Sequence, residues 1–339
     1  MKTALVWAFL GLCSMALNGA RVPIATIGNG QIQAKIYLPD ARRGFYRGTR
    51  FDWSGVIYSL QFGGHDYYGP WFTKTDPSIH DFVYKDNDIV AGPCSAITGP
   101  VDEFKPLGWE DAKPGSTFIK IGVGALRKAD TGAYDNYHLY DIANAGKWRV
   151  KKNRDSITFL QTLNDKSSGY AYVYRKTVVL TAGKAEMVLR HSIKNTGTRA
   201  IETSVYNHNF LVLDRRPPGP GVAITVPFQI QSTRPPNKSL AEIRGDHISY
   251  LAILKDRDTV TTPLQGFSDS IKDNQIRIEN SALGAGMTIQ ADHPLLSESL
   301  WSIRSVVAME PFIAISIKPG QEFTWTSTYE YYAVPGAGK

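Results

Sequence analysis

Two ionisable side chains inside apolar segments are the strongest candidates for acid–base chemistry in this sequence. The first is Glu310, in the middle of the apolar segment 306–317 (VVAMEPFIAISI), which ends at the turn residues 318–320 (KPG). A carboxylate in an apolar interior costs several kcal/mol unless it is paired, protonated or lining a cavity. A structural ion pair and a catalytic carboxylate both satisfy this condition. In the catalytic case, burial would raise the pKa of Glu310 toward neutrality, which suits a general base.

The second candidate is His208, which lies in another apolar segment, within the sequence YNHNF. Side chains alternate between the two faces of a strand. His208 therefore shares one face with Tyr206 and Phe210. The other face holds Asn207 and Asn209. Three consecutive polar side chains in a core strand are costly unless each finds a hydrogen bond. This cluster is therefore either a satisfied network or the floor of a site.

The segments that carry these residues are rich in Val, Ile, Thr and Tyr and are separated by Gly, Pro, Asn and Asp, a pattern typical of β-strands. The predicted strands are 31–38, 56–62, 118–123, 157–163, 170–180, 187–194, 201–213, 222–231, 249–254, 275–279, 287–290, 306–317 and 323–332. No fixed period recurs and no crossover helices separate the strands. The pattern therefore predicts an all-β fold, a large antiparallel β-sandwich. The one short helix candidate is 239–243.

The segment 67–110 is the least regular part of the chain and is rich in Gly, Pro, Asp and aromatic residues. We expect it to form long loops over one end of the sandwich. Aromatic side chains on loops of a rigid β scaffold suit carbohydrate binding, because the C–H face of a sugar stacks on an aromatic ring. For any single ring, packing against the core is an equally good explanation.

The N-terminus has the pattern of a secretory signal peptide. A charged start (MK) precedes an apolar run over residues 4–17, followed by small and polar residues, and cleavage after Ala16 or Ala20 fits the pattern. We expect residues 1–20 to be a signal peptide and residues 21–339 to form a single domain, exported to the periplasm or the extracellular space. No later apolar run is long enough for a membrane helix.

The composition argues against several other classes of function. The formal net charge is +7, but the lysines and arginines are scattered and form no basic stripe, so nucleic acid is not an expected partner. Only Cys94 remains after removal of the signal peptide, which excludes a disulfide framework. The sequence contains no Walker motif, no Gly-x-Ser-x-Gly elbow and no His-Glu-x-x-His zinc motif.

The stretches around the two candidates resemble the aldose 1-epimerases, a family of galactose mutarotase-like proteins. Residues 187–197 (MVLRHSIKNTG) and 207–210 (NHNF) are similar to the central strands of that family, whose histidine is the general acid. Residues 306–311 (VVAMEP) and 319–323 (PGQEF) are similar to its C-terminal segment, whose glutamate is the general base. The resemblance covers roughly residues 176–332.

This resemblance implies a galactose mutarotase-like supersandwich and an isomerase that opens the hemiacetal ring of an aldose and recloses it on the other face. Glu310 would take the proton from the anomeric hydroxyl while His208 protonates the ring oxygen. The two groups are expected to flank the sugar in one aromatic-lined cleft, separated by a gap that a pyranose ring fits. The implied ligand is a small-molecule sugar or an oligosaccharide end, and the reaction needs no metal or organic cofactor.

The resemblance also assigns residues to substrate binding. Arg50 stands for the family's sugar-binding arginine. Asp269, in the loop 266–269 (GFSD), stands for an aspartate that binds a sugar hydroxyl. Asn207 and Trp301, from the matching segments, complete the predicted binding set.

The sequence departs from the family at a second sugar-binding histidine. His65, His80 and His138 all lack the expected Gly-Gly neighbours in the right order. This departure keeps two other classes of function open. One is a non-catalytic carbohydrate-binding protein on the same scaffold, which sugar binding without anomer interconversion would indicate. The other is a polysaccharide-processing enzyme such as a lyase, which the release of ultraviolet-absorbing uronate products would indicate.

Overall fold

The computed structural model describes residues 22–334, and the predicted signal peptide lies outside these residues. Nearly all regular structure in this range consists of strands, β1 to β25, accompanied by two short 3-10 helices, η1 (Leu213–Arg215) and η2 (Ile271–Asp273). The all-β prediction is confirmed. Within the same range, no helix has the length and apolar character that crossing a membrane requires.

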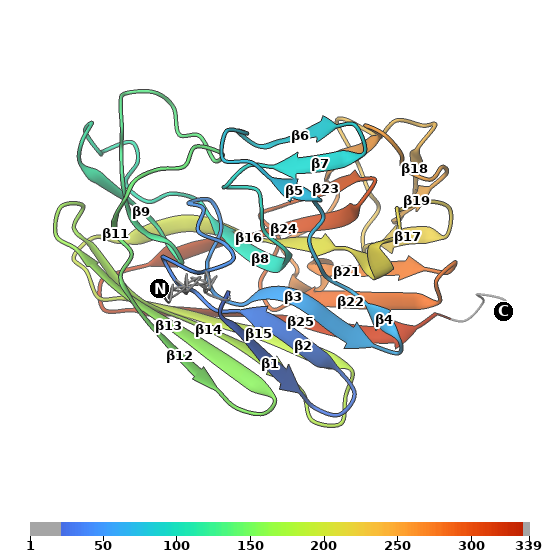
Figure 1. Cartoon of the computed structure of the whole chain (residues 1–339), viewed down its shortest axis with the longest axis horizontal. Coiled ribbons are helices and arrows are strands. Elements are labelled where there is room, and N and C mark those ends of the chain that lie inside the picture. Colours follow the sequence, from blue (N-terminus) through green and yellow to red (C-terminus); the bar gives the residue numbers. More distant parts are fainter. Residues whose placement is uncertain (1–21, 335–339) are drawn as a thin grey trace, which may run out of the picture.

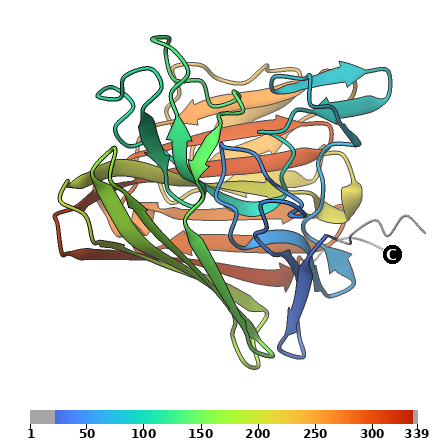
Figure 2. The ribbon, with the colours of Figure 1, turned by 60° about the vertical axis from the view of Figure 1, so that its left-hand side comes forward.

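Ten antiparallel strands form the largest sheet. In spatial order they are β12 (Lys147–Lys152), β13 (Ser156–Asp165), β14 (Tyr170–Leu180), β15 (Glu186–Asn195), β25 (Glu322–Ala333), β22 (Ala285–Ala291), β21 (Gln275–Asn280), β17 (Val222–Thr225), β19 (His247–Tyr250) and β18 (Ala241–Arg244). Figure 2 shows its green strands slanting across the view while its red and orange strands run nearly horizontally, so the sheet is twisted. The helix candidate 239–243 is wrong, because residues 241–243 belong to β18, which pairs with β19, and residues 239–240 lie in the preceding turn.

Five antiparallel strands form the second large sheet, which carries both acid–base candidates. In spatial order they are β20 (Thr259–Leu264), β23 (Ser297–Ile303), β24 (Val306–Ile317), β16 (Ile201–Leu211) and β8 (Gly99–Phe104). Two neighbouring inner strands of this sheet are long, and both are mostly buried where the candidate residues lie. They are β16 and β24, which hold His208 and Glu310 respectively.

Three small sheets complete the fold. The first contains β1 (Ile24–Gly28), β2 (Gln33–Tyr37), β3 (Val56–Phe62) and β4 (His65–Asp66), the second β11 (Ile142–Asn144), β10 (Gly124–Arg127) and β9 (Thr117–Lys120), and the third β5 (Lys74–Thr75), β7 (Asp88–Ala91) and β6 (Phe82–Lys85). The segment 67–110 is therefore not only loops, since it contains β5 to β8. Figure 1 shows the third small sheet above β23 and β24, and β9 and β11 of the second at the left of the view.

Buried apolar side chains lie on both faces of the five-stranded sheet. On one face, Met309 of β24 belongs to the same buried cluster as Leu189 of β15 and Tyr329 of β25, which is the core between the two large sheets. On the other face, Phe210 of β16 belongs to a second cluster that includes Trp71 from the covering segments. The candidate residues thus lie under a covered face, not on an open one.

A layer of buried polar side chains also crosses the space between the two large sheets. Lys176 Nζ of β14 lies 2.7 Å from Asp102 Oδ2 of β8, and His191 Nε2 of β15 lies 2.9 Å from the same oxygen. These side chains are at most 2% exposed. Burial alone would raise the pKa of Asp102, but Lys176 and His191 outweigh it and hold that pKa well below its usual value. The buried charges are therefore paired, as a low-dielectric interior requires.

Strand β23 places another carboxyl, Glu298, in the interior. The residue is 3% exposed, and neither carboxyl oxygen has a hydrogen-bond partner among residues 22–334. Burial raises the pKa of Glu298 from 4.5 to about 8. Between these two pH values the unfolded chain loses the proton while the folded chain keeps it. The free energy of unfolding therefore falls as the pH rises through this window.

Replacing Glu298 by Gln removes this titration and preserves the size of the side chain. We expect Glu298→Gln to stabilise the fold progressively between pH 5 and pH 8, by about 1–3 kcal/mol at the upper end. Urea unfolding of both proteins at a series of pH values measures the difference. The exposed Glu322 provides a matched control, because Glu322→Gln should give no such trend. A gain for Glu298→Gln that does not vary with pH would contradict a buried, protonated carboxyl.

Candidate active site

His208 and Glu310 face each other across two neighbouring strands. In the antiparallel pair of β16 and β24, Asn209 lies opposite Met309, which brings the preceding His208 opposite Glu310. The Nε2 atom of His208 lies 3.0 Å from Oε1 of Glu310. The structure thus brings together the two residues that the sequence singled out for acid–base chemistry.

This direct contact corrects one expectation, because no pyranose-sized gap separates the two groups. Side chains opposite each other on paired strands start from Cβ atoms only about 5 Å apart, which leaves no room for a sugar ring between them. A ring can only lie beside the pair. Hemiacetal chemistry is compatible with this arrangement, since the anomeric hydroxyl and the ring oxygen are bonded to the same carbon. An acid and a base that serve these two oxygens must themselves be neighbours.

Burial shifts the pKa values of the two groups toward their neutral forms. Burial raises the pKa of Glu310 from 4.5 to about 7, although a hydrogen bond donated by Ser299 Oγ at 2.8 Å opposes the shift. Burial, and after it the positive charge of Arg50, lowers the pKa of His208 well below its usual value. The distance alone would suit an ion pair, but both shifts disfavour charge. We therefore interpret the resting pair as a protonated Glu310 carboxyl in contact with a neutral His208 ring.

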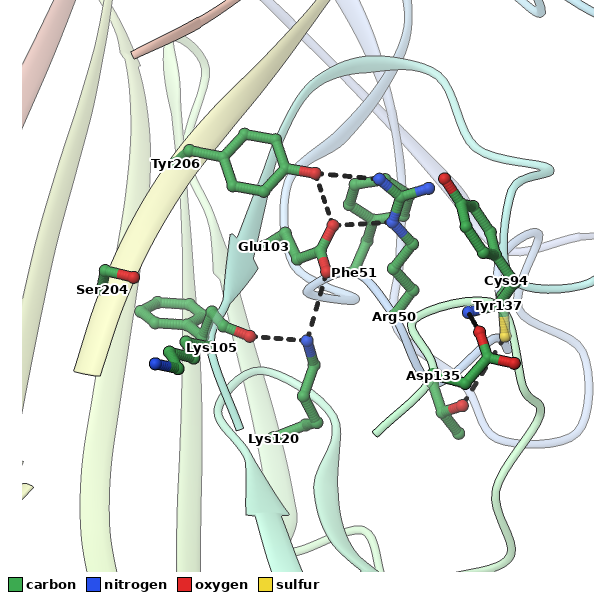
Figure 3. A network of polar contacts seen from close by, with 12 residues as sticks. Arg50, Phe51, Cys94, Glu103, Lys105, Lys120, Asp135, Tyr137, Ser204 and Tyr206 are labelled. Atoms are coloured by element: carbon green, nitrogen blue, oxygen red, sulfur yellow. Dashed lines mark hydrogen bonds and ion pairs between the residues drawn. The ribbon is translucent and has the colours of Figure 1, made fainter. Parts of the chain in front are cut away.

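Arg50 is fixed beside this pair by a buried polar network. Its Nε donates to Glu103 Oε2 at 2.6 Å and its Nη2 donates to the Tyr206 hydroxyl at 3.0 Å. That hydroxyl donates in turn to Glu103, and Lys120 Nζ lies 3.6 Å from the same carboxylate (Figure 3). Burial alone would raise the pKa of Glu103, but the charges of Arg50 and Lys120 outweigh it and lower that pKa. Glu103 is therefore ionised and holds Arg50 in place.

The pair lines a cleft of about 300 Å³, named here the His208 cleft. Arg50 and Trp301, both predicted to bind substrate, line it as well. Five further aromatic residues and six further polar residues contribute to its wall, namely Phe51, Trp71, Phe82, Tyr137, Phe210, Asp81, Ser95, Arg234, Thr261, Thr262 and Ser299. The indole of Trp301 packs edge-on against the His208 ring, with 5.7 Å between ring centroids. The cleft is thus lined by both aromatic and polar side chains.

The other two predicted binding residues lie elsewhere. Asn207 is on the opposite face of β16, where its Nδ2 donates to Asp102 and its Oδ1 accepts from the Tyr329 hydroxyl, each at 3.1 Å. It belongs to the polar layer between the two sheets, because strand alternation turns it away from its neighbour His208. Asp269 is exposed in the loop before η2 and does not line the His208 cleft. Neither residue is retained as a binding residue.

None of the three histidines considered for the second sugar contact lines this cleft. His65 Nδ1 lies 2.6 Å from Asp214 Oδ2, in a separate hollow near β4. His80 has a side chain that is 64% exposed and contacts Asp135. His138 packs against the ring of Tyr140. The departure from the family pattern seen in the sequence is therefore also present in the structure.

Several residues of the site were not predicted from the sequence. Glu103 is the clearest example, because it orients Arg50, yet it lies in a segment that was expected to form loops. Two consecutive carboxylates, Asp102 and Glu103, within the short apolar run of β8 are the signal that could have identified it. Tyr137 and Arg234 come from loops without a recognisable pattern, and only the tertiary structure brings them to the cleft.

No family model and no curated protein matches the amino-acid sequence. Solved structures do match the fold over most of the chain. A putative aldose 1-epimerase from Escherichia coli K12 has a TM-score of 0.52 and 15% identity, over 92% of this chain and 100% of the other. A galactose mutarotase related enzyme from Lactobacillus acidophilus has a TM-score of 0.53 and 14% identity, over 93% and 100%. An aldose epimerase homologue from C. elegans has a TM-score of 0.53 and 13% identity, over 92% and 99%.

These neighbours agree with the resemblance carried by residues 187–197 and 306–311. Identities of 13–15% show a shared fold and leave the activity to be argued from the site. The chain, over the residues described, has the fold of the aldose 1-epimerases and galactose mutarotase-like proteins.

Proposed function

We propose that this chain is an exported sugar mutarotase, in which residues 21–339 form a single domain that interconverts the anomers of an aldose. The observation that carries the proposal is the contact between His208 Nε2 and Glu310 Oε1, at 3.0 Å, within a cleft lined by aromatic rings. The galactose mutarotase-like fold supports the same reaction class. The N-terminal signal pattern supports export.

Mutarotation requires removal of the proton of the anomeric hydroxyl and protonation of the ring oxygen. When the carboxyl proton moves from Glu310 to His208, the pair becomes a carboxylate base and an imidazolium acid. Glu310 then accepts the proton of the anomeric hydroxyl while His208 protonates the ring oxygen, and the bond between the anomeric carbon and the ring oxygen breaks. The open aldehyde recloses on its other face as both protons return. Protons and electrons balance within the pair and the sugar.

Two further residues are suited to hold the sugar beside this pair. Arg50 uses one donor on Glu103 and one on Tyr206, so its guanidinium is fixed while other N–H groups can serve sugar hydroxyls. Trp301 offers an aromatic surface next to the His208 ring, on which the C–H face of a pyranose can stack. Binding and proton transfer therefore rest on separate groups.

A non-catalytic carbohydrate-binding protein is the second candidate, favoured by the absence of a second histidine among the residues that line the cleft. The same polar and aromatic wall would serve binding without turnover. The two candidates differ in whether His208 and Glu310 transfer protons to and from the sugar. Removal of the Glu310 carboxyl therefore separates them.

We expect Glu310→Gln to lower kcat/KM for anomer interconversion by about a hundredfold or more, because Gln cannot accept the anomeric proton. D-Glucose and D-galactose are the probes, the decay of optical rotation reports turnover, and isothermal titration reports binding. Sugar affinity should change little, because Gln preserves the shape of the side chain. Glu322→Gln, at an exposed position, is the control. Wild-type turnover in Glu310→Gln would refute the role of Glu310, and binding without turnover in the unmodified protein would establish the second candidate.

The pH dependence of kcat/KM should reflect the loss of the single proton that the resting pair of His208 and Glu310 carries. The reaction needs one proton shared by His208 and Glu310, and burial raises the pKa of Glu310 to about 7. Above this pH the pair loses that proton, so kcat/KM should fall as the pH rises through about 7. At low pH, a second proton on His208 removes the base and should also lower kcat/KM. A rate that instead rises through pH 7 would show that the fully deprotonated pair is the active form.

Ser299 tests this assignment independently. Its hydroxyl donates to Glu310 and stabilises the carboxylate, so its removal should raise the pKa of the pair. We expect Ser299→Ala to move the alkaline limb of the kcat/KM profile to higher pH, with a smaller change at the optimum. Polarimetry over a pH series measures both. An unshifted limb would mean that another group controls the pH dependence.

A further inference from the structure

A second hollow, of about 650 Å³, adjoins the His208 cleft. Arg50 and Glu310 line both spaces, so these two residues stand at the boundary between them. Sites that hold drug-sized ligands measure about 300–1,000 Å³. The His208 cleft alone is at the lower end of this range, and the two spaces together are large for one sugar ring.

Strand alternation explains why the two spaces lie next to each other on one face of the sheet. On β16, Ser204 and Tyr206 point to the same face as His208. On β24, Phe312 points to the same face as Glu310. Ser204, Tyr206 and Phe312 line the second hollow, named here the Phe312 hollow, while His208 lines only the first. The face of one sheet therefore leads from the proton pair directly into the Phe312 hollow, and Figure 3 shows Ser204 and Tyr206 on the strand beside Arg50.

The wall of the Phe312 hollow is suited to carbohydrate. The rings of Phe312 and Tyr206 are stacked, with centroids 4.3 Å apart and planes 22° apart, and Phe312 is partly exposed. Such a ring offers a flat apolar surface to the C–H face of a sugar. Lys105 and Glu110 are exposed at the rim and can exchange hydrogen bonds with hydroxyls. Aromatic surface with mixed polar groups favours a neutral polyhydroxylated ligand over a purely apolar one.

We propose that the Phe312 hollow is a subsite for a neighbouring sugar unit, and that the substrate class is therefore a reducing disaccharide or longer oligosaccharide. This inference rests on the proposed mutarotase function. Only the His208 cleft is lined by both members of the proton pair, so the reacting ring presents its anomeric carbon there. The next unit lies against Phe312 and Tyr206. The boundary residue Arg50, held by Glu103, can contact both units.

The test compares D-glucose with four disaccharides whose reducing glucose is linked at O2, O3, O4 or O6 (sophorose, laminaribiose, cellobiose and gentiobiose). We expect at least one disaccharide to exceed glucose in kcat/KM for mutarotation by about tenfold, the value of one good aromatic contact. Ser204→Tyr fills the Phe312 hollow, and Phe312→Leu removes its aromatic surface. Each should bring the ratio of disaccharide to glucose close to one. Thr324→Tyr, on an exposed position of β25, is the matched control and should leave the ratio unchanged.

The outcomes separate this inference from the function on which it rests. If glucose is turned over and no disaccharide is faster, the subsite is refuted and the mutarotase stands. If the gain persists in both variants, the second unit binds elsewhere and the subsite is also refuted. If no sugar is turned over, the mutarotase fails for glucose, and isothermal titration decides the subsite. Disaccharide binding that is tighter than glucose binding and weakened by Ser204→Tyr then supports it, and its absence refutes it.

Discussion

A buried ion pair between Lys176 and Asp102 connects the two large sheets, and the position of the candidate site depends on it. Lys176 comes from the ten-stranded sheet and Asp102 from the edge strand β8 of the five-stranded sheet. Removing one partner of such a pair leaves an uncompensated buried charge and costs about 3–5 kcal/mol. The pair thereby fixes β8 against the core. Because the next residue, Glu103, faces the other way, the same constraint places the carboxylate that holds Arg50.

The alternation of side chains along β16 also gives its polar residues two different roles. Asn207 joins the layer between the sheets through Asp102 and Tyr329, whereas His208 points to the covered face and meets Glu310. One strand thus supplies structural hydrogen bonds on one side and a member of the proposed proton pair on the other. A shift of one residue in the register of β16 would turn Asn207 to the covered face and His208 to the space between the sheets. The apolar core that fixes this register therefore also keeps His208 next to Glu310.

The sequence was sufficient to select His208 and Glu310 as candidates, because each is an ionisable residue within a buried strand, and the structure places the two side chains in contact. It was insufficient for Glu103, since β8 is short and pairs only with the distant strand β16. Asn207 lies away from the cleft for a different reason: residues adjacent in a strand lie on opposite faces. Asp269 rested on a short loop match, and loop position depends on tertiary contacts that no local pattern contains.

Two carboxyls of this sheet, in neighbouring strands, show that a raised pKa alone does not mark a site. Glu298 has a pKa of about 8 and Glu310 one of about 7, and burial is the main cause in both. Glu298 lies in the core and has no hydrogen-bond partner among the described residues, so no neighbouring group in that range is placed to accept its proton. Glu310 contacts an imidazole, accepts a hydrogen bond from Ser299 and borders two hollows. The proton acceptor beside it and the space for a ligand, not the size of the shift, are what make Glu310 the candidate for catalysis.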